Sequence, residues 1–187
     1  MTGRYSAPEL LAGHHELDGF ECQSSEQTDW LRRHARQSAS TGTTRVFVVA
    51  QAESPVVVAY YGWCMAQLST IAAPARLPRG AGRYPQPVAL LARLGVDVRH
   101  EGQGLGVGLL QVVFARLVGL SEDIGCRGLL VHAESPEARE FYLHLLPEFE
   151  ESPTDPLHLV LLMKDIRRTV GRQPLWSYSA PFIIRCQ

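Results

Sequence analysis

The chain lacks the features that would place it in a membrane or outside the cell. Among its 187 residues no apolar run reaches the roughly 18 residues of a membrane span, and residues 1–17 lack the basic-then-apolar order of a signal peptide. Its cysteines stand singly rather than at CxxC spacing, at Cys22, Cys64, Cys126 and Cys186. This scatter argues against a zinc site or a disulfide framework. We therefore expect a cytoplasmic protein without membrane anchor or metal.

Composition excludes disorder and fibrous structure. A chain with 45% hydrophobic and 20% charged residues lies in the ordinary globular range, and its length suits one domain. We expect that domain to span residues 1–166, followed by a tail at 167–187. The tail contains Trp176, Tyr178 and Phe182 and is too apolar for a free linker, so we expect it to dock on the domain or on a partner.

The net charge of −1 hides a strong asymmetry along the chain. From Arg32 to Arg99 nine arginines face two acids, Glu53 and Asp97, which gives +7 and leaves −8 for the remainder. A segregated positive field suits an anionic partner, whether a coenzyme, a nucleic acid or an acidic protein. The alternative interpretation, an ordinary solvated face, applies to most single arginines.

Hydrophobic periodicity predicts an α/β (α+β) fold with a mixed central sheet and helices on both faces. Two helical segments, beginning at Pro8 and Ser24, precede strands at 44–50 and 56–67, a basic loop at 70–87, a strand at 88–98, a helix at 109–120, a strand at 128–132, a helix at 136–146 and a strand at 157–163. Ser24 and Gln27 have the spacing of a helix-capping pair.

The most informative stretch is the segment 99–110, Arg-His-Glu-Gly-Gln-Gly-Leu-Gly-Val-Gly-Leu-Leu. It follows an expected strand and opens an expected helix. Alternating glycines permit positive φ and a close approach of the backbone, and unpaired N–H groups at a helix start converge on an anion. A pyrophosphate fits such a cradle.

Two common nucleotide motifs do not match this segment. No Lys-Ser/Thr follows the loop, and glycines at 102, 104, 106 and 108 never give GxGxxG. The segment instead resembles the pyrophosphate motif of GNAT-type N-acetyltransferases, Gln/Arg-x-x-Gly-x-Gly/Ala, as Glu101-x-x-Gly104-x-Gly106. A register that starts at Arg99 also satisfies the pattern but places the glycines two residues early relative to the strand.

The resemblance implies the GNAT acyl-coenzyme A fold with a splayed strand pair, and acetyl-coenzyme A as co-substrate. Carried onto this chain, the coenzyme is bound by main-chain groups of the strand and by the loop, at Val96, Val98, Gln103, Gly104, Leu105, Gly106, Val107 and Gly108. The segment from Ala138 to Phe141-Tyr142 resembles the family's Ala-x-x-Phe-Tyr signature, which makes Tyr142 the general acid for the departing thiolate. Where the family continues with a short turn and Gly-Phe, this chain has Leu145 to Phe149, about two residues longer.

Within the superfamily the chain resembles the GNAT toxins of bacterial toxin-antitoxin pairs, which acetylate the α-amine of aminoacyl-tRNA. The shared features run from His15 to Asp165, about four fifths of the chain. The resemblance implies aminoacyl-tRNA as substrate, a ribbon-helix-helix antitoxin as partner and, because the branch is often dimeric, a homodimer. The arginines expected to bind tRNA phosphates are Arg32, Arg33, Arg36, Arg79 and Arg83.

Two other functions remain open. One is a GNAT enzyme that acetylates a small-molecule amine or a protein N-terminus, and the other is a degenerate, non-catalytic domain that binds coenzyme A or a partner. Among further candidate residues, His14 and His15 lack other ligands at metal spacing. Asp97 is expected to anchor a strand end or loop rather than act as a base, and His132 to line the strand beside the site.

Overall fold

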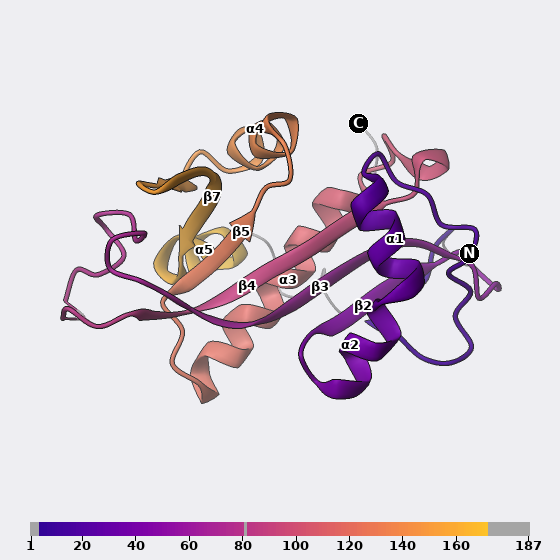
Figure 1. Cartoon of the computed structure of the whole chain (residues 1–187), viewed down its shortest axis with the longest axis horizontal. Helices are drawn as coiled ribbons and strands as arrows, with labels where there is room; N and C mark the ends of the chain where they lie inside the picture. Colours follow the sequence, from indigo (N-terminus) through magenta and orange to yellow (C-terminus); the bar gives the residue numbers. More distant parts are fainter. Residues whose placement is uncertain (1–3, 81, 172–187) are drawn as a thin grey trace. The chain divides into compact units, whose positions relative to one another are not determined.

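The structure is a computed structural model, and it describes residues 4–80 and 82–171. In chain order its elements are β1 (Glu9–Leu10), α1 (Ser25–Arg33), α2 (Ala35–Thr41), β2 (Arg45–Ala50), β3 (Val57–Leu68), β4 (Gln86–Val96), the 3-10 turn η1 (Val98–His100), α3 (Leu105–Asp123), β5 (Gly128–His132), α4 (Pro136–Leu145), β6 (Glu150–Ser152), β7 (Asp155–Leu162) and α5 (Met163–Gly171) (Figure 1). Within the described residues the strands form a seven-stranded sheet in the order β1-β2-β3-β4-β5-β7-β6.

The sheet mixes parallel and antiparallel pairs, which confirms the predicted fold class. β2 runs antiparallel to β1 and β3, and β7 runs antiparallel to β5 and β6. β4 and β5 are parallel, and their pairing covers only Ala89–Leu91 against Leu129–Val131. β4 continues to Val96 after this pairing ends, as the resemblance to a fold with a splayed strand pair implies.

The described residues divide into two compact units. The first unit comprises residues 4–63 and 93–113, and the second comprises residues 64–80, 82–92 and 114–171. β3, β4 and α3 contribute residues to both. Residue 166, the predicted end of the domain, lies within α5. The remainder of the predicted tail, 172–187, lies outside the described residues.

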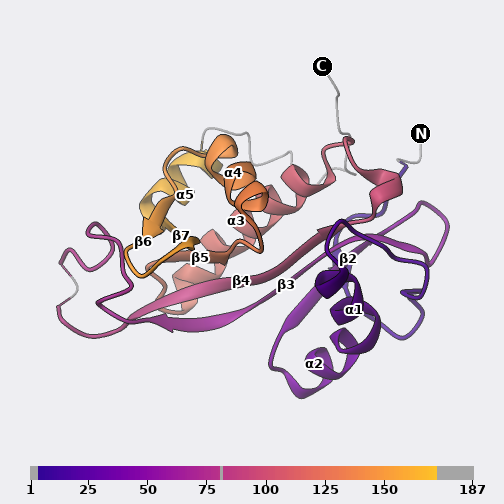
Figure 2. The ribbon, with the colours of Figure 1, turned by 45° about the horizontal axis from the view of Figure 1, so that its top comes forward.

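The first unit contains α1 and α2 packed beside β2, as both Figure 1 and Figure 2 show. Ser24 caps α1, because its side chain accepts a hydrogen bond from the Gln27 N–H at 3.1 Å. The Gln27 side chain also has a partner on the sheet. Its Oε1 accepts from the Tyr60 hydroxyl at 2.9 Å and so ties α1 to β3.

The core of the first unit is built on Tyr60. Its ring contacts Phe20 edge-on and stacks on Trp30, with centroids 5.4 and 6.0 Å apart. A Cβ atom on Gly95 would lie 2.7 Å from a carbon of the Tyr60 ring. Glycine at this position of β4 therefore lets the ring lie against the strand backbone.

The second unit packs the remaining strands against α4 and α5. Leu68, Leu77, Val88, Leu130 and Val160 form its buried apolar cluster together with neighbouring residues. The same unit carries the basic loop between β3 and β4, whose predicted extent of 70–87 agrees with the observed connection between Leu68 and Gln86. Leu77 is fully buried and holds the base of that loop.

α3 is the one helix among the described residues that is long and apolar enough to cross a membrane, with a hydropathy of 1.5. Gln111 and Arg116 interrupt its apolar run, which is why the sequence shows no uninterrupted span. Leu109, Leu110 and Leu117 are almost completely buried. Core helices of folded domains meet the same test of length and composition.

Several sequence expectations need correction. The segment from Pro8 is not a helix, since Glu9–Leu10 forms β1 and pairs with Phe47 and Val48 of β2. Two residues are too few to show a period, and the edge of β2 decides their conformation. α3 begins at Leu105, four residues before the predicted start, because glycines weaken the apolar pattern. α2, β6 and α5 were not expected.

Candidate functional site

The predicted coenzyme loop forms a tight turn at the start of α3. Gly102 and Gly104 have φ of 70° and 76°, a region in which glycine has no steric penalty. The Gly108 N–H donates to the Gly104 carbonyl at 2.9 Å and closes the first helical turn. The N–H groups of residues 105–107 precede that bond and have no partner within the helix. These amides, together with the helix dipole, can bind an anion.

Alternating glycines permit positive φ, but only Gly102 and Gly104 of the four use it, since Gly106 and Gly108 lie inside α3. The reason is that helical hydrogen bonding already begins at Gly104. The observed helix start places Gly104 at the N-cap, which agrees with the register Glu101-x-x-Gly104-x-Gly106. Without a Cβ, the first turn leaves its amides open to close approach.

Arg99 and Asp97 form an internal ion pair that shapes the turn before the loop. The completely buried Asp97 carboxylate accepts hydrogen bonds from the Arg99 Nε at 2.8 Å, from the Arg99 N–H at 3.0 Å and from the Glu21 N–H at 3.0 Å. Burial raises the pKa of Asp97, but these hydrogen bonds outweigh burial and lower it to about 2. Asp97 is therefore an ionised carboxylate that anchors the turn to Arg99 and Glu21.

The remaining polar groups of the loop are also engaged. The Arg99 guanidinium donates to the Gly19 carbonyl at 2.6 Å as well as to Asp97, so these donors are already used within the fold. Glu101, which takes the place of the family's Gln or Arg, accepts from the Gln23 side chain at 3.1 Å. Gln103 accepts from Arg4 at 2.8 Å, a contact that no sequence pattern indicated.

Val96 and Val98, the two strand residues predicted to bind the coenzyme, lie in different elements. Val96 is the last residue of β4. Val98 already belongs to η1, and its N–H donates to the Glu21 carbonyl at 2.8 Å. In this conformation the Val98 amide is not a free donor, so its predicted contact would have to use the carbonyl group.

Tyr142 lies on α4 in the second unit. Ser135 caps this helix by accepting from the Ala138 N–H, and Pro136 occupies its first turn. Tyr142 is 6% exposed, with its ring edge-on to Phe141 and Phe149 at centroid distances of 5.2 and 5.8 Å. Phe149, at the end of the longer turn, thus supplies an aromatic contact. Burial raises the pKa of Tyr142, so its phenol stays protonated at neutral pH.

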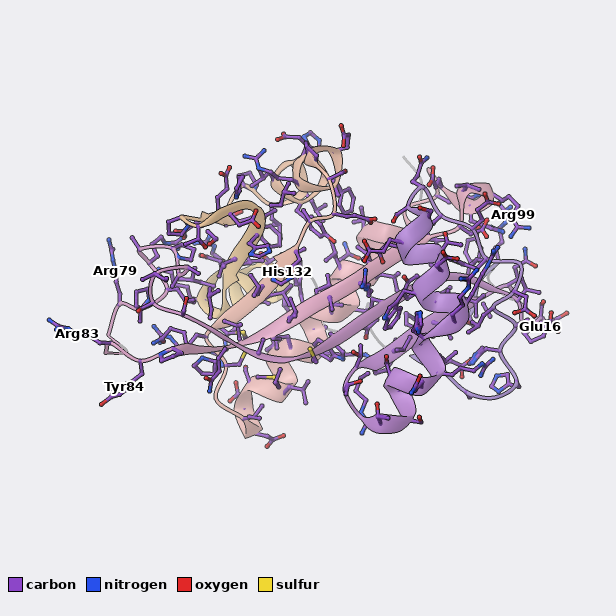
Figure 3. The ribbon with its side chains drawn as sticks, in the orientation of Figure 1. Glu16, Arg79, Arg83, Tyr84, Arg99 and His132 are labelled. Atoms are coloured by element: carbon purple, nitrogen blue, oxygen red, sulfur yellow. The ribbon has the colours of Figure 1, made fainter. Side chains whose placement is uncertain are left out.

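A histidine pair also lies in the second unit. His132, labelled in Figure 3, ends β5 and stands opposite His158 of β7, and the two rings stack with centroids 3.8 Å apart. His158 lies 3.5 Å from a carboxylate oxygen of Asp155. Sequence reasoning placed His132 on its strand but missed this partner, because 26 positions separate the two and only strand register joins them.

The five arginines predicted to bind tRNA occupy different surroundings. Arg79 and Arg83 project from the β3–β4 loop, as Figure 3 shows, next to Tyr84, which is 78% exposed. Arg32 and Arg33 are exposed on α1, where Arg33 faces Asp29 at 3.6 Å. The structure places Arg79 and Arg83 together on one loop and Arg32 and Arg33 together on one helix.

Arg36 has a structural function that the sequence did not suggest. Its guanidinium donates to the carbonyl oxygens of Ala12 and His15 at 2.9 and 2.6 Å. These bonds tie the irregular segment after β1 to α2. A guanidinium held in this way has fewer donors left for a phosphate.

Glu9, His14 and His15 bring their ligand atoms within 4.8 Å of one another. The Ala12 N–H donates to His15 Nδ1 at 3.0 Å, so in neutral His15 the proton resides on Nε2, which lies 3.2 Å from Glu9. Both ring nitrogens of His15 are thus occupied. In this conformation His15 and Glu9 form a hydrogen-bonded pair, and the His14 ring lies beside it with its centroid 4.0 Å from that of His15.

The fold has clear relatives among solved structures. A crystal structure of a KacT mutant has a TM-score of 0.81, with 21% identity, and covers 89% of this chain and 99% of that one. AtaT complexed with acetyl-methionyl-tRNAfMet gives 0.79 and 22%, over 87% and 98% of the two chains. A mutant AtaT bound to the C-terminus of the antitoxin AtaR and acetyl-CoA gives 0.74 and 21%, over 88% and 97%. The fold is that of the GNAT-type toxins.

The chain also has a close relative in sequence. A tRNA-acetylating toxin of Mycobacterium tuberculosis is 40% identical over 171 residues, which span 91% of this chain and 99% of that protein. No protein-family model matches the chain. At this identity and coverage, the chain belongs to the family of tRNA-acetylating toxins, which are GNAT-type acetyltransferases.

Proposed function

We propose that this protein transfers the acetyl group of acetyl-coenzyme A to the α-amine of aminoacyl-tRNA and thereby blocks translation. The observation that carries the proposal is the turn at Gly102–Gly104, which opens the N–H groups of 105–107 in a chain 40% identical to a tRNA-acetylating toxin. An acylated α-amine cannot attack a peptidyl ester. One acetyl transfer per tRNA molecule is therefore enough to remove that molecule from elongation.

The residues of the loop and the strand divide the binding of the coenzyme between them. Amides of residues 104–108 hold the diphosphate, and the Gln103 side chain adds a polar contact beside them. Main-chain groups of Val96 and Val98 hold the pantetheine arm. Acetyl-coenzyme A supplies an activated thioester carbonyl, and a backbone donor at its oxygen would stabilise the charge that develops as the amine attacks.

Tyr142 serves as the general acid in this proposal. When the tetrahedral intermediate collapses, the carbon–sulfur bond breaks and the thiolate takes a proton from the phenol. The raised pKa keeps the phenol protonated before this step. No described residue accepts a hydrogen bond from the Tyr142 hydroxyl, so its proton is not committed to a partner in the fold.

The β3–β4 loop is our proposed contact for the tRNA. Its base is fixed, since the Arg127 guanidinium donates to the carbonyl oxygens of Leu77 and Arg79 at 2.8 and 2.9 Å. Beyond this base, Arg83 and Tyr84 are exposed. Exposed guanidinium groups can pair with phosphates, and an exposed phenol ring can stack on an unpaired base.

The further partners follow from the family. We propose that an antitoxin of the ribbon-helix-helix class covers the toxin and that the protein acts in the cytoplasm, where charged tRNA is found. A homodimer remains a prediction. If the protein instead acetylates small amines, it needs no antitoxin, and its expression alone should not arrest growth.

The deciding experiment incubates the purified protein with total charged tRNA and labelled acetyl-coenzyme A, and then identifies the labelled aminoacyl adenosine after nuclease digestion. We expect label on the α-amine of one or a few aminoacyl adenosines. Label confined to added small amines or peptides would indicate the second enzymatic function. Binding of coenzyme A without any turnover would indicate a degenerate domain.

A further inference from the structure

We propose that Arg4 binds a phosphate of the coenzyme, and that Arg4 and Tyr5 together orient the Gln103 amide toward the same ligand. The inference rests on the proposed function, because it concerns the coenzyme loop. It adds to that loop a segment from the far N-terminus, here called the N-terminal arm and comprising residues 4–6.

The N-terminal arm is attached to the sheet rather than to the loop alone. The Ser6 N–H donates to the Ala50 carbonyl at 2.9 Å, and Tyr5 forms an antiparallel bridge with Gln51. The Ser6 hydroxyl in turn accepts from the Ala50 N–H at 2.9 Å. This extension of the β2 end gives Arg4 and Tyr5 a defined place.

From that place the arm holds the Gln103 side chain. The Gln103 Oε1 accepts from the Arg4 guanidinium at 2.8 Å and from the Tyr5 hydroxyl at 2.7 Å. Arginine can only donate, so the oxygen of the Gln103 amide must face the arm. Its NH₂ group then faces away from the arm and keeps both donors for another acceptor.

A directed chain of hydrogen bonds holds Tyr5 itself. Because its hydroxyl donates to Gln103, the His100 Nδ1 at 3.0 Å must be the donor to Tyr5. The His100 Nε2 then carries no proton and accepts from the Gln51 side chain at 3.3 Å. Burial lowers the pKa of His100, which favours this neutral form. The arm and the loop are therefore joined by one ordered network.

Arg4 is the cation beside the loop whose charge no carboxylate neutralises among the described residues. The motif position that carries Gln or Arg in the family is Glu101 in this chain, and Arg99 is neutralised by Asp97. Arg4 forms no ion pair with any carboxylate in the described part of the chain, and its hydrogen-bond partner Gln103 is neutral. A cation with uncompensated charge, docked on the loop that presents free amides, complements a phosphate group.

The test compares Arg4→Gln with the intact protein, using calorimetric titration with coenzyme A and with 3′-dephospho-coenzyme A. We expect Arg4→Gln to weaken binding of coenzyme A roughly tenfold or more, as for the loss of a charge-assisted hydrogen bond. An equal loss with the dephospho form assigns Arg4 to the diphosphate, and a smaller loss assigns it to the 3′-phosphate. Tyr5→Phe should weaken both ligands by a smaller factor.

A matched measurement separates phosphate binding from a merely structural contribution. The kcat/KM for S-acetylpantetheine, which has no phosphate, should be the same in Arg4→Gln and the intact protein. Arg167→Gln, at an exposed arginine in α5 paired with Glu122, serves as the control and should bind coenzyme A normally. The inference fails if Arg4→Gln binds coenzyme A normally or loses equally with S-acetylpantetheine. If the intact protein binds no coenzyme A, the proposed function fails as well.

Discussion

His132 at the end of β5 stacks on His158 of β7, with the two ring planes inclined by only 16°. Burial, and after it the neighbouring His158, lowers the pKa of His132 below its ordinary value of 6.5. The cause is that protonation would place a charge in a partly desolvated position and beside a second imidazole ring. The folded protein therefore favours a neutral His132.

This relationship predicts a pH dependence of stability. Below the ordinary pKa of 6.5 the unfolded chain binds a proton at His132 that the folded protein binds less readily, so stability is full above that pH and is lost as the pH falls. We expect His132→Gln to flatten the fall in Tm between about pH 7 and pH 5. Thermal scans across this range measure it. His144→Gln, at an exposed position of α4, should keep the slope of the intact protein, and equal slopes in all three proteins would refute the assignment.

The sequence predicted the elements whose pattern is local. The cap at Ser24, the strands at 44–50 and 56–67 and the glycine turn before α3 all depend on residues within a few positions of one another. Each of these segments has either a clear hydrophobic period or a residue type typical of its structure, such as serine at a helix cap or glycine in a tight turn. The fold class followed from their order.

The parts that could not be predicted depend on contacts between distant residues. The bond from Arg4 to Gln103 spans 99 positions, and the stacking of His132 on His158 needs the register of β5 against β7. No local pattern encodes such pairs. Arg36 shows the same limit in another form, because an arginine bound to backbone carbonyls looks in sequence like any surface arginine.

Asp97 provides a second prediction about stability. Its pKa is lowered to about 2, so its contribution is present above the ordinary value of 3.8 and is lost as the pH falls from there toward 2. Asp97→Asn should lower the free energy of unfolding at pH 7 by about 1–3 kcal/mol. Urea titrations should show the difference from the intact protein shrinking below about pH 4. Asp18→Asn, at an exposed position, should change little at either pH, and a pH-independent deficit in Asp97→Asn would contradict the ionised anchor.

Tyr142→Phe tests the general acid. Removing the hydroxyl should lower kcat by about 10²- to 10⁴-fold, because the thiolate would leave without a proton donor. The affinity for coenzyme A and the Tm should stay close to those of the intact protein, since the ring keeps its contacts with Phe141 and Phe149. Steady-state kinetics with aminoacyl-tRNA measure kcat, and calorimetry measures the affinity. An unchanged kcat would show that another group or water protonates the sulfur.

The predicted tRNA arginines should separate into two groups by experiment. Arg83→Ala should raise the KM for aminoacyl-tRNA and reduce the slope of log KM against log salt by roughly one unit, as for the loss of one phosphate contact. Arg36→Ala should instead lower the free energy of unfolding by about 1–3 kcal/mol, because the carbonyls of Ala12 and His15 lose the hydrogen bonds from the guanidinium. Its salt slope should match the intact protein. If Arg36→Ala altered the salt slope and Arg83→Ala did not, the tRNA contact would be assigned to α2 and not to the β3–β4 loop.

Gly128, at the start of β5, tests how tightly the second unit is packed. A Cβ atom there would lie 2.5 Å from the Leu161 carbonyl oxygen on β7, and the next nearest atoms are also β7 backbone, so no flexible side chain can move away. We expect Gly128→Ala to lower the free energy of unfolding by about 1–3 kcal/mol. Gly119→Ala is the matched control, because Gly119 lies within α3 with nothing within 4 Å of the added carbon, and alanine should stabilise that helix by about 0.5–1 kcal/mol. Chemical denaturation of both variants should show a lower free energy of unfolding for Gly128→Ala and a higher one for Gly119→Ala. A neutral Gly128→Ala would mean that β5 and β7 can separate at this register without cost, which would also weaken the stacking assigned to His132 and His158 at the other end of the same strand pair.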